Sequence, residues 1–122
     1  MLNHKNCTSY ADAVALFSYG KAKNNQIKLS NNTYLMKDDD KYYVIFHGSK
    51  IITYLPNGDM ILDHCGYKTK TTKDRFNFHM PKNFKLFQAK SLWYIVRNGK
   101  EDFSFEDALI IRVNDEVEPM GN

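Results

Sequence analysis

The sequence has no long apolar run, few cysteines and no glycine-rich loop. No apolar run approaches the ~18 residues that would span a bilayer, and residues 1–6 lack the apolar stretch of a signal peptide. Two cysteines, Cys7 and Cys65, cannot by themselves build a disulfide framework or a four-ligand zinc site. The six glycines never lie closer than eight residues apart, which excludes a glycine-rich phosphate loop.

The composition is that of a small globular protein. The chain has 122 residues, of which 43% are hydrophobic and 25% are charged, so we expect residues 1–122 to form a single domain with a packed core. Aromatic residues reach 14%, with 8 Tyr and 8 Phe. Side chains of this size dominate small cores, so most of these rings are expected inside the fold.

The first periodic segment predicts a helix from Thr8 to Tyr19. Tyr10 and Phe17 recur at helical spacing among alanines, which are strong helix formers. Ser9, with Asp12 three positions later, resembles a capping box at the start of the helix. Gly20 is expected to end it.

After this segment the apolar period changes to two, which predicts β-strands. Asn57-Gly58 after Pro56 is a strong hairpin signal, and Gly48-Ser49 suits a two-residue turn. The first four runs are expected to form an antiparallel meander. The strand-like runs are residues 33–37, 42–47, 51–55, 60–64, 84–88, 92–97 and 108–113.

A second short helix is predicted near residues 71–80. Thr71 with Asp74 three positions later suits a cap, and Pro81 stops the helix. The fold class is therefore α+β, a small antiparallel sheet of six or seven strands with a central meander and two short helices. Residues 114–122 are acidic and are expected to form a frayed tail.

Charge is segregated along the chain. The net charge of +3 is the remainder of +4 over residues 1–37, −3 over 38–65, +8 over 66–100 and −6 over 101–122. Aromatic residues are interleaved with the cations of the +8 block. This composition is typical of surfaces that bind anions and stack flat rings, although lysines on a solvated strand face give the same pattern.

Residues 66–77 carry the strongest candidate site. Hydroxyls and cations lead up to a predicted helix N-terminus, where free backbone N–H groups and the helix dipole favour an anion. The structural alternative stays open, in which Thr71 only caps the helix and Arg75 only pairs with an acid such as Asp63. The candidate nucleic-acid or phosphate contacts are Lys68, Lys70, Thr71, Thr72, Lys73 and Arg75, with Tyr54 or Tyr67 stacking on a ring.

Catalytic and metal chemistry find little support in the residue spacing. Asp63-His64-Cys65 offers three ligand types in a row, but neighbours in a strand point to opposite faces. No CxxC, HxH or HExxH spacing occurs. We therefore predict no catalytic residues, no metal and no cofactor, and keep as an alternative a metal-dependent nuclease or phosphodiesterase centred on His47, Asp63 and His64.

Several motifs, in order, resemble a family of small uncharacterised bacteriophage and prophage proteins. The resemblance covers about residues 10–112, and its pattern is NNTYL, then HG, TY.P.G, TTKDR.N and WY.V. In this chain the motifs are Asn31-Asn32-Thr33-Tyr34-Leu35, His47-Gly48, Thr53-Tyr54 with Pro56 and Gly58, Thr71-Thr72-Lys73-Asp74-Arg75 with Asn77, and Trp93-Tyr94 with Val96.

The resemblance implies a phage or prophage origin and action in the host cytoplasm, and it implies no activity. By analogy with other small phage accessory proteins, we expect a non-enzymatic binding protein that inhibits or redirects a host nucleic-acid-handling or defence system. The expected partner is a host protein or nucleoprotein complex, or a nucleic acid, with no membrane. A nucleotide-sequestering small oligomer is the alternative, and a homodimer remains open.

Overall fold

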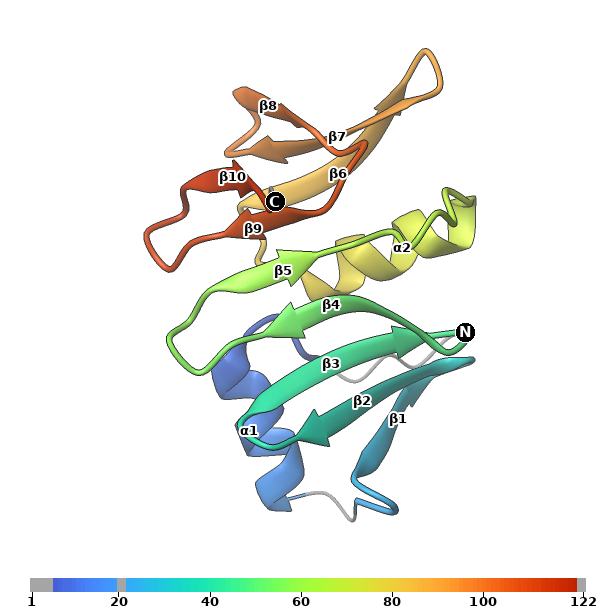
Figure 1. Ribbon diagram of the computed structural model, residues 1–122, viewed down its shortest axis with the longest axis vertical. Helices are drawn as coiled ribbons and strands as arrows, with labels where there is room; N and C mark the ends of the chain where they lie inside the picture. The colour runs from blue at the N-terminus through green and yellow to red at the C-terminus, as the bar shows by residue number, and fades with distance from the viewer. Residues whose placement is uncertain (1–5, 20–21, 121–122) are drawn as a thin grey trace.

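The computed structural model describes residues 6–19 and 22–120, and within them the chain forms two helices and ten strands (Figure 1). The helices are α1 (Tyr10–Tyr19) and α2 (Lys70–His79). The strands are β1 (Gln26–Ser30), β2 (Thr33–Asp38), β3 (Lys41–Phe46), β4 (Ser49–Tyr54), β5 (Met60–Leu62), β6 (Phe84–Ala89), β7 (Leu92–Arg97), β8 (Glu101–Ser104), β9 (Leu109–Ile111) and β10 (Val117–Pro119).

The strands form two antiparallel sheets. The larger has the order β1-β2-β3-β4-β5-β9-β10, and the smaller has the order β6-β7-β8 (Figure 1). The predicted α+β class and the meander, which is β2 to β5, are confirmed. Strands β1, β8 and β10 lie where the sequence pattern carries no strand expectation.

Helix α1 begins as the sequence predicts. Ser9 Oγ accepts a hydrogen bond from the Asp12 backbone N–H at 3.1 Å, and the Asp12 carboxylate accepts one from the Thr8 backbone N–H at 2.9 Å. The rings of Tyr10 and Phe17 each meet the ring of Tyr42 edge-on at 5.3 Å, so α1 packs on the inner face of β3. The predicted stop at Gly20 lies outside the described residues.

The N-cap of helix α2 lies two residues before the predicted one. Thr69 is the N-cap, and its Oγ1 accepts a hydrogen bond from the Thr72 backbone N–H at 3.2 Å. Thr71 is therefore inside the first turn and does not cap the helix. Asp74, three positions after Thr71, makes Thr71 resemble the start of a capping box, but the structure uses Thr69 without such a partner.

Helix α2 lies between the two sheets. On one side it contacts β3 and β4, and on the other it contacts β6. Phe76 meets Phe105 edge-on at 5.2 Å, and both rings are fully buried with Trp93. One continuous core thus joins the inner faces of both sheets through α2.

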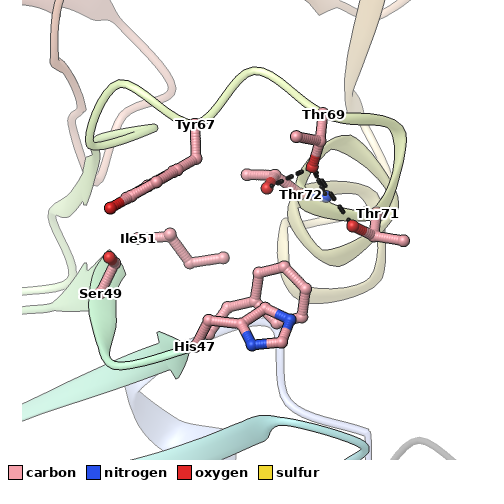
Figure 2. Close-up of a pocket in the computed structure, with 8 residues that line it drawn as sticks. His47, Ser49, Ile51, Tyr67, Thr69, Thr71 and Thr72 are labelled. Atoms are coloured by element: carbon pink, nitrogen blue, oxygen red, sulfur yellow. Dashed lines mark hydrogen bonds between the residues drawn. The ribbon is translucent and has the colours of Figure 1, made fainter.

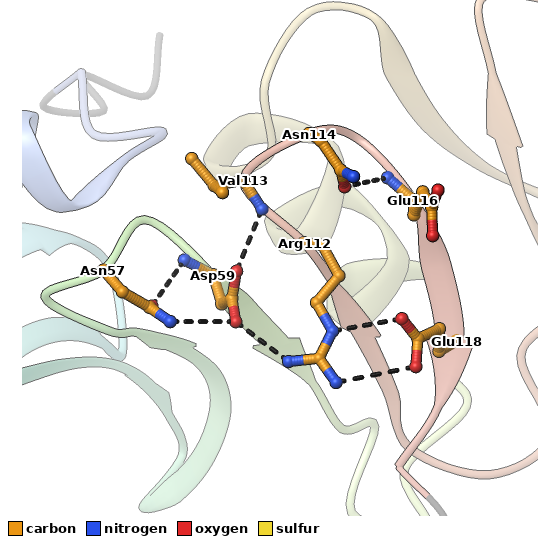
Figure 3. A network of polar contacts seen from close by, with 7 residues as sticks. All are labelled: Asn57, Asp59, Arg112, Val113, Asn114, Glu116 and Glu118. Atoms are coloured by element: carbon orange, nitrogen blue, oxygen red, sulfur yellow. Dashed lines mark hydrogen bonds and ion pairs between the residues drawn. The ribbon is translucent and has the colours of Figure 1, made fainter.

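The acidic tail is not frayed over residues 117–119, which corrects the sequence expectation. Val117–Pro119 forms β10, paired with β9. Arg112 links β10 to the turn before β5. Its Nε donates to Glu118 at 3.1 Å, and its Nη1 donates to the buried Asp59 at 3.0 Å (Figure 3). Residues 121–122 lie outside the described part of the chain.

Candidate functional site

A hollow of about 330 Å³ lies where the first turn of α2 faces the β3–β4 hairpin (Figure 2). Its wall combines aromatic rings, hydroxyl groups and aliphatic carbon from three separate chain segments. The lining residues are Phe46, His47, Ser49, Ile51, Tyr67, Thr69, Thr71 and Thr72.

The hairpin turn places His47 at the hollow. His47 and Gly48 have φ values of 49° and 80°, which is the two-residue turn with both central residues left-handed that twisted hairpins favour. The turn is thus His47-Gly48, one residue before the predicted Gly48-Ser49. Histidine tolerates this conformation better than most residues with a Cβ, and glycine has no penalty there.

A β-bulge brings Ile51 to the floor of the hollow. Val44 pairs with Ile52 and Ile45 pairs with Lys50, so Ile51 is the extra residue on β4. Its carbonyl accepts a hydrogen bond from the Asp63 backbone N–H at 2.9 Å. Ile51 is 1% exposed and gives the hollow an apolar base.

The loop before α2 holds Tyr67 over this base. Gly66 N–H donates to Nδ1 of His64 at 3.0 Å, and His64 Nε2 donates to the Glu106 carbonyl at 2.7 Å. The Tyr67 backbone N–H donates to the His64 carbonyl at 2.9 Å. With its loop anchored in this way, the Tyr67 ring stands at the hollow with 61% of the residue exposed (Figure 2).

Three threonines of the α2 N-terminus form the opposite wall. The Thr69 hydroxyl lies 3.2 Å from that of Thr71 and 2.9 Å from that of Thr72 (Figure 2). The first N–H groups of a helix have no acceptor within the helix, and the dipole makes this end partially positive. Thr69 accepts the N–H of Thr72, and the N–H groups of Lys70 and Thr71 have no acceptor within residues 6–19 and 22–120, so they can bind a ligand or water.

Three predicted contact residues are buried, and two of them, Arg75 and Tyr54, do not line the hollow. Arg75 is 6% exposed; its Nε donates to Thr33 Oγ1 at 2.8 Å, and its guanidinium lies over the Phe46 ring at 5.0 Å. Thr72 is 2% exposed in the first turn. Tyr54 is 1% exposed, and its hydroxyl donates to the His79 carbonyl at 2.7 Å, so it cannot stack on a ligand.

The remaining predicted residues divide into two groups. Tyr67 and Thr71 line the hollow, whereas Lys68, Lys70 and Lys73 lie outside the lining set. Lys68 Nζ forms an ion pair with Glu106 at 2.7 Å. Among residues 6–19 and 22–120, no ion pair joins Arg75 to Asp63.

Sequence reasoning did not select Ser49, Ile51 and Thr69 for this site. His47 entered only as a candidate for the nuclease alternative. Gly48 indicated a turn here, but nothing local indicates which helix packs against that turn. The contact depends on tertiary packing between segments about 20 residues apart.

The residues of Asp63-His64-Cys65 do not assemble a metal site. Within the described ranges, no three His, Cys, Asp or Glu side chains gather to hold a metal ion. Partial burial, helped by the charge of Asp63, raises the pKa of Cys65 above its ordinary value. Its thiol is therefore mostly protonated at neutral pH.

The fold and site define a small α+β protein with a ligand-sized hollow between a helix N-terminus and a β-hairpin. Residues 14–112 match the protein family described as Kyanoviridae Gp96 protein. The chain therefore belongs to this family of phage proteins. The resemblance to phage proteins is thereby confirmed. Neither a curated protein nor a solved structure matches the chain. No helix among the described residues is long and apolar enough to cross a membrane.

Proposed function

We propose that this chain is a phage accessory protein that acts by binding, and that the hollow captures a nucleotide-sized ligand carrying a phosphate and a flat ring. Such capture would interfere with a host nucleic-acid-handling or defence system in the host cytoplasm. The observation that carries the proposal is the hollow itself, which joins an exposed aromatic ring to a helix N-terminus.

The size of the hollow favours a small ligand over a long nucleic-acid tract. Its volume of about 330 Å³ is at the lower end of the range of about 300–1,000 Å³ for small-molecule sites. A tract along residues 66–77 would need several free cations, but Arg75 is buried and Lys68 is paired with Glu106. The nucleotide-binding alternative is thus the better supported of the two.

The chemistry of the wall matches the two halves of a nucleotide. The free N–H groups at Lys70 and Thr71, with the hydroxyls of Thr71 and Ser49, suit phosphate oxygens. The exposed ring of Tyr67 suits a base, and Ile51 supplies apolar contact beneath it. Lys70, outside the lining set, adds positive potential near the same helix end.

Binding without catalysis is part of the proposal. Both ring nitrogens of His64 are engaged, by Gly66 and Glu106, which supports a structural role for this histidine. His47 reaches the hollow from the hairpin turn, where it can donate to a phosphate. His47 is accordingly assigned to ligand binding in this proposal, and we assign it no part in a chemical step.

A thermal-shift screen with mononucleotides and cyclic dinucleotides tests the proposal. A ligand at about 100 times its Kd should raise Tm by about 5–10 °C. Tyr67→Ala and Thr71→Val should abolish the shift, because the first removes the ring and the second removes a hydroxyl that does not cap α2. Tyr19→Ala, which removes another exposed tyrosine, is the matched control and should keep it. No shift with any nucleotide would contradict the proposal.

A further inference from the structure

The three-stranded sheet has an outward face that differs from its buried one. Phe84, Leu86, Trp93 and Ile95 point into the core and are at most 3% exposed. Because side chains alternate along a strand, the neighbouring positions face solvent. The cross-strand pairs on this outward face are Lys85 with Val96, Phe87 with Tyr94 and Ala89 with Leu92.

Two aromatic rings form the centre of this face. Phe87 and Tyr94 lie opposite each other on β6 and β7, with ring centroids 5.4 Å apart and an interplanar angle of 24°. Phe87 is 37% exposed and Leu92 is 42% exposed. A hollow of about 440 Å³ adjoins Phe87, and its lining also includes Lys82, Lys85 and Val96.

The surroundings of the rings are basic. Residues 81–100 contain five cations and no acid. Arg97 is paired with Glu101 at 2.6 Å, whereas none of the four lysines, at 82, 85, 90 and 100, forms an ion pair with the residues that the structure describes. Asp102 on β8 pairs directly with Val96, so it lies on this same face of the sheet.

We propose that this face, which we name the β6–β8 platform (Lys82, Lys85, Phe87, Tyr94 and Val96), binds single-stranded nucleic acid. Unpaired bases stack on the Phe87–Tyr94 pair, and phosphates lie near Lys82 and Lys85. Aromatic side chains beside a basic groove are how sequence-tolerant single-strand binders hold their ligand. In a duplex the bases already stack on one another, so the rings would have no base face to meet.

Charge argues against a second copy of the chain as the occupant. A two-fold symmetric dimer through the platform would bring the same patch of each subunit together. Lys82 and Lys85 would then face a patch of the same sign, with Asp102 as the acid available to offset them. A polyanion with flat rings complements both the charge and the rings.

Fluorescence anisotropy with labelled oligothymidylate, oligouridylate and a matched DNA duplex tests this inference. The single strands should bind at low salt, and the duplex should bind at least about tenfold more weakly. Phe87→Ala should weaken binding about tenfold, the usual scale of one lost stacking contact, while Phe87→Tyr should retain it. Phe78→Ala, at an exposed phenylalanine on α2, is the matched control and should leave binding unchanged.

The salt dependence gives a second, independent measurement. The logarithm of the association constant falls linearly with the logarithm of the salt concentration. Lys85→Ala should make this slope less steep by about 0.7, as expected for one lost phosphate contact to a single strand. Lys28→Ala, at an exposed lysine on β1, should not change it. Circular dichroism and thermal melts of each variant establish that it is folded.

Several outcomes would overturn the inference. They are an absence of oligonucleotide binding at low salt, equal affinity for the duplex, and equal effects of Phe87→Ala and Phe78→Ala. Sedimentation velocity showing a dimer that Phe87→Ala dissociates would assign the platform to a second copy instead. The platform is separate from the hollow at α2, so Tyr67→Ala should leave oligonucleotide binding intact, and either proposal can fail alone.

Discussion

The side-chain amide of Asn77 on α2 bonds both backbone groups of Leu86 on β6. Asn77 Oδ1 accepts from the Leu86 N–H at 2.8 Å, and Asn77 Nδ2 donates to the Leu86 carbonyl at 3.1 Å. Since β6 is an edge strand, the amide takes the place of a neighbouring strand there. The helix and the smaller sheet are thus linked by hydrogen bonds as well as by apolar packing.

Replacing Asn77 with Ala should lower the free energy of unfolding by about 1–3 kcal/mol. The change leaves the Leu86 N–H and carbonyl without their partners at a partly buried place. Urea denaturation measures the difference. Asn31→Ala, at an exposed asparagine, is the control and should change the free energy by less than about 0.5 kcal/mol. Equal effects of the two substitutions would show that the amide link does not stabilise the fold.

Thr69 and Thr71 should respond differently to the same substitution. Thr69→Ala removes the cap of α2 and should cost about 1 kcal/mol of stability. Thr71→Ala, at an exposed position inside the first turn, should cost less than about 0.5 kcal/mol. Urea denaturation of both variants checks the difference. A larger effect at Thr71 would move the cap back to the position that the sequence suggests.

Arg75 should matter for stability more than for binding. Arg75→Ala removes the guanidinium that lies on Phe46 and bonds Thr33, so we expect a loss of about 2–4 kcal/mol. Lys73→Ala, two residues earlier on α2 and partly exposed, should cost less than about 0.5 kcal/mol. Denaturant unfolding curves give both values. A stable Arg75→Ala protein that has lost ligand binding would restore Arg75 as a contact residue.

Asp59 should make the protein sensitive to acid. Burial alone would raise the pKa of Asp59, but hydrogen bonds from the Arg112 side chain, the Val113 backbone and the Asn57 side chain outweigh it and lower the pKa below 3.8 (Figure 3). A carboxylate with a lowered folded pKa stabilises the fold above its unfolded pKa. This contribution is lost as pH falls from about 4 through the folded pKa.

Asp59→Asn should therefore flatten the stability profile at its acid end. Urea unfolding between about pH 2 and pH 6 should show the wild-type protein losing stability more steeply than the variant below about pH 4. Asp63→Asn, at an exposed aspartate, is the comparison. If Asp59→Asn keeps the wild-type steepness, other carboxylates cause the acid sensitivity.

The two thiols should differ in reactivity. Burial raises the pKa of Cys7 to about 12, and the side chain is 0% exposed. Cys65 is exposed, although partial burial and Asp63 raise its pKa above 9.0. The native protein should thus react with a thiol reagent once per chain, slowly at neutral pH, and a second time after unfolding. Cys65→Ser should abolish the native reaction, and any remaining reaction would mean that the Cys7 region opens.

Local signals were sufficient for much of the fold. The helical spacing with the Ser9 and Asp12 cap predicts α1, and Asn57-Gly58 marks the turn between β4 and β5. These features depend on a few neighbouring residues, whose backbone preferences act whether or not the rest of the chain is folded. For the same reason, the sequence was sufficient to predict the α+β class and the central meander.

Strands without an alternating apolar pattern could not be predicted from local sequence signals. Strand β10 lies within an acidic segment. It forms because its backbone pairs with β9 and because Glu118 forms an ion pair with Arg112. Strand β9 itself joins β5 from a distant part of the chain. Such a strand pairs with the unpaired edge of a sheet that the rest of the chain has formed.

The sequence alone determined the place of the charged and hydroxyl-rich segment at residues 66–77, since composition is local. Only the tertiary structure decided which of its groups face solvent. Arg75 turns inward because α2 packs on β3 and β4, whereas Tyr67 and Thr71 face His47 and Ile51 across a hollow. Burial depends on contacts between distant segments, and residue type and spacing do not specify those contacts.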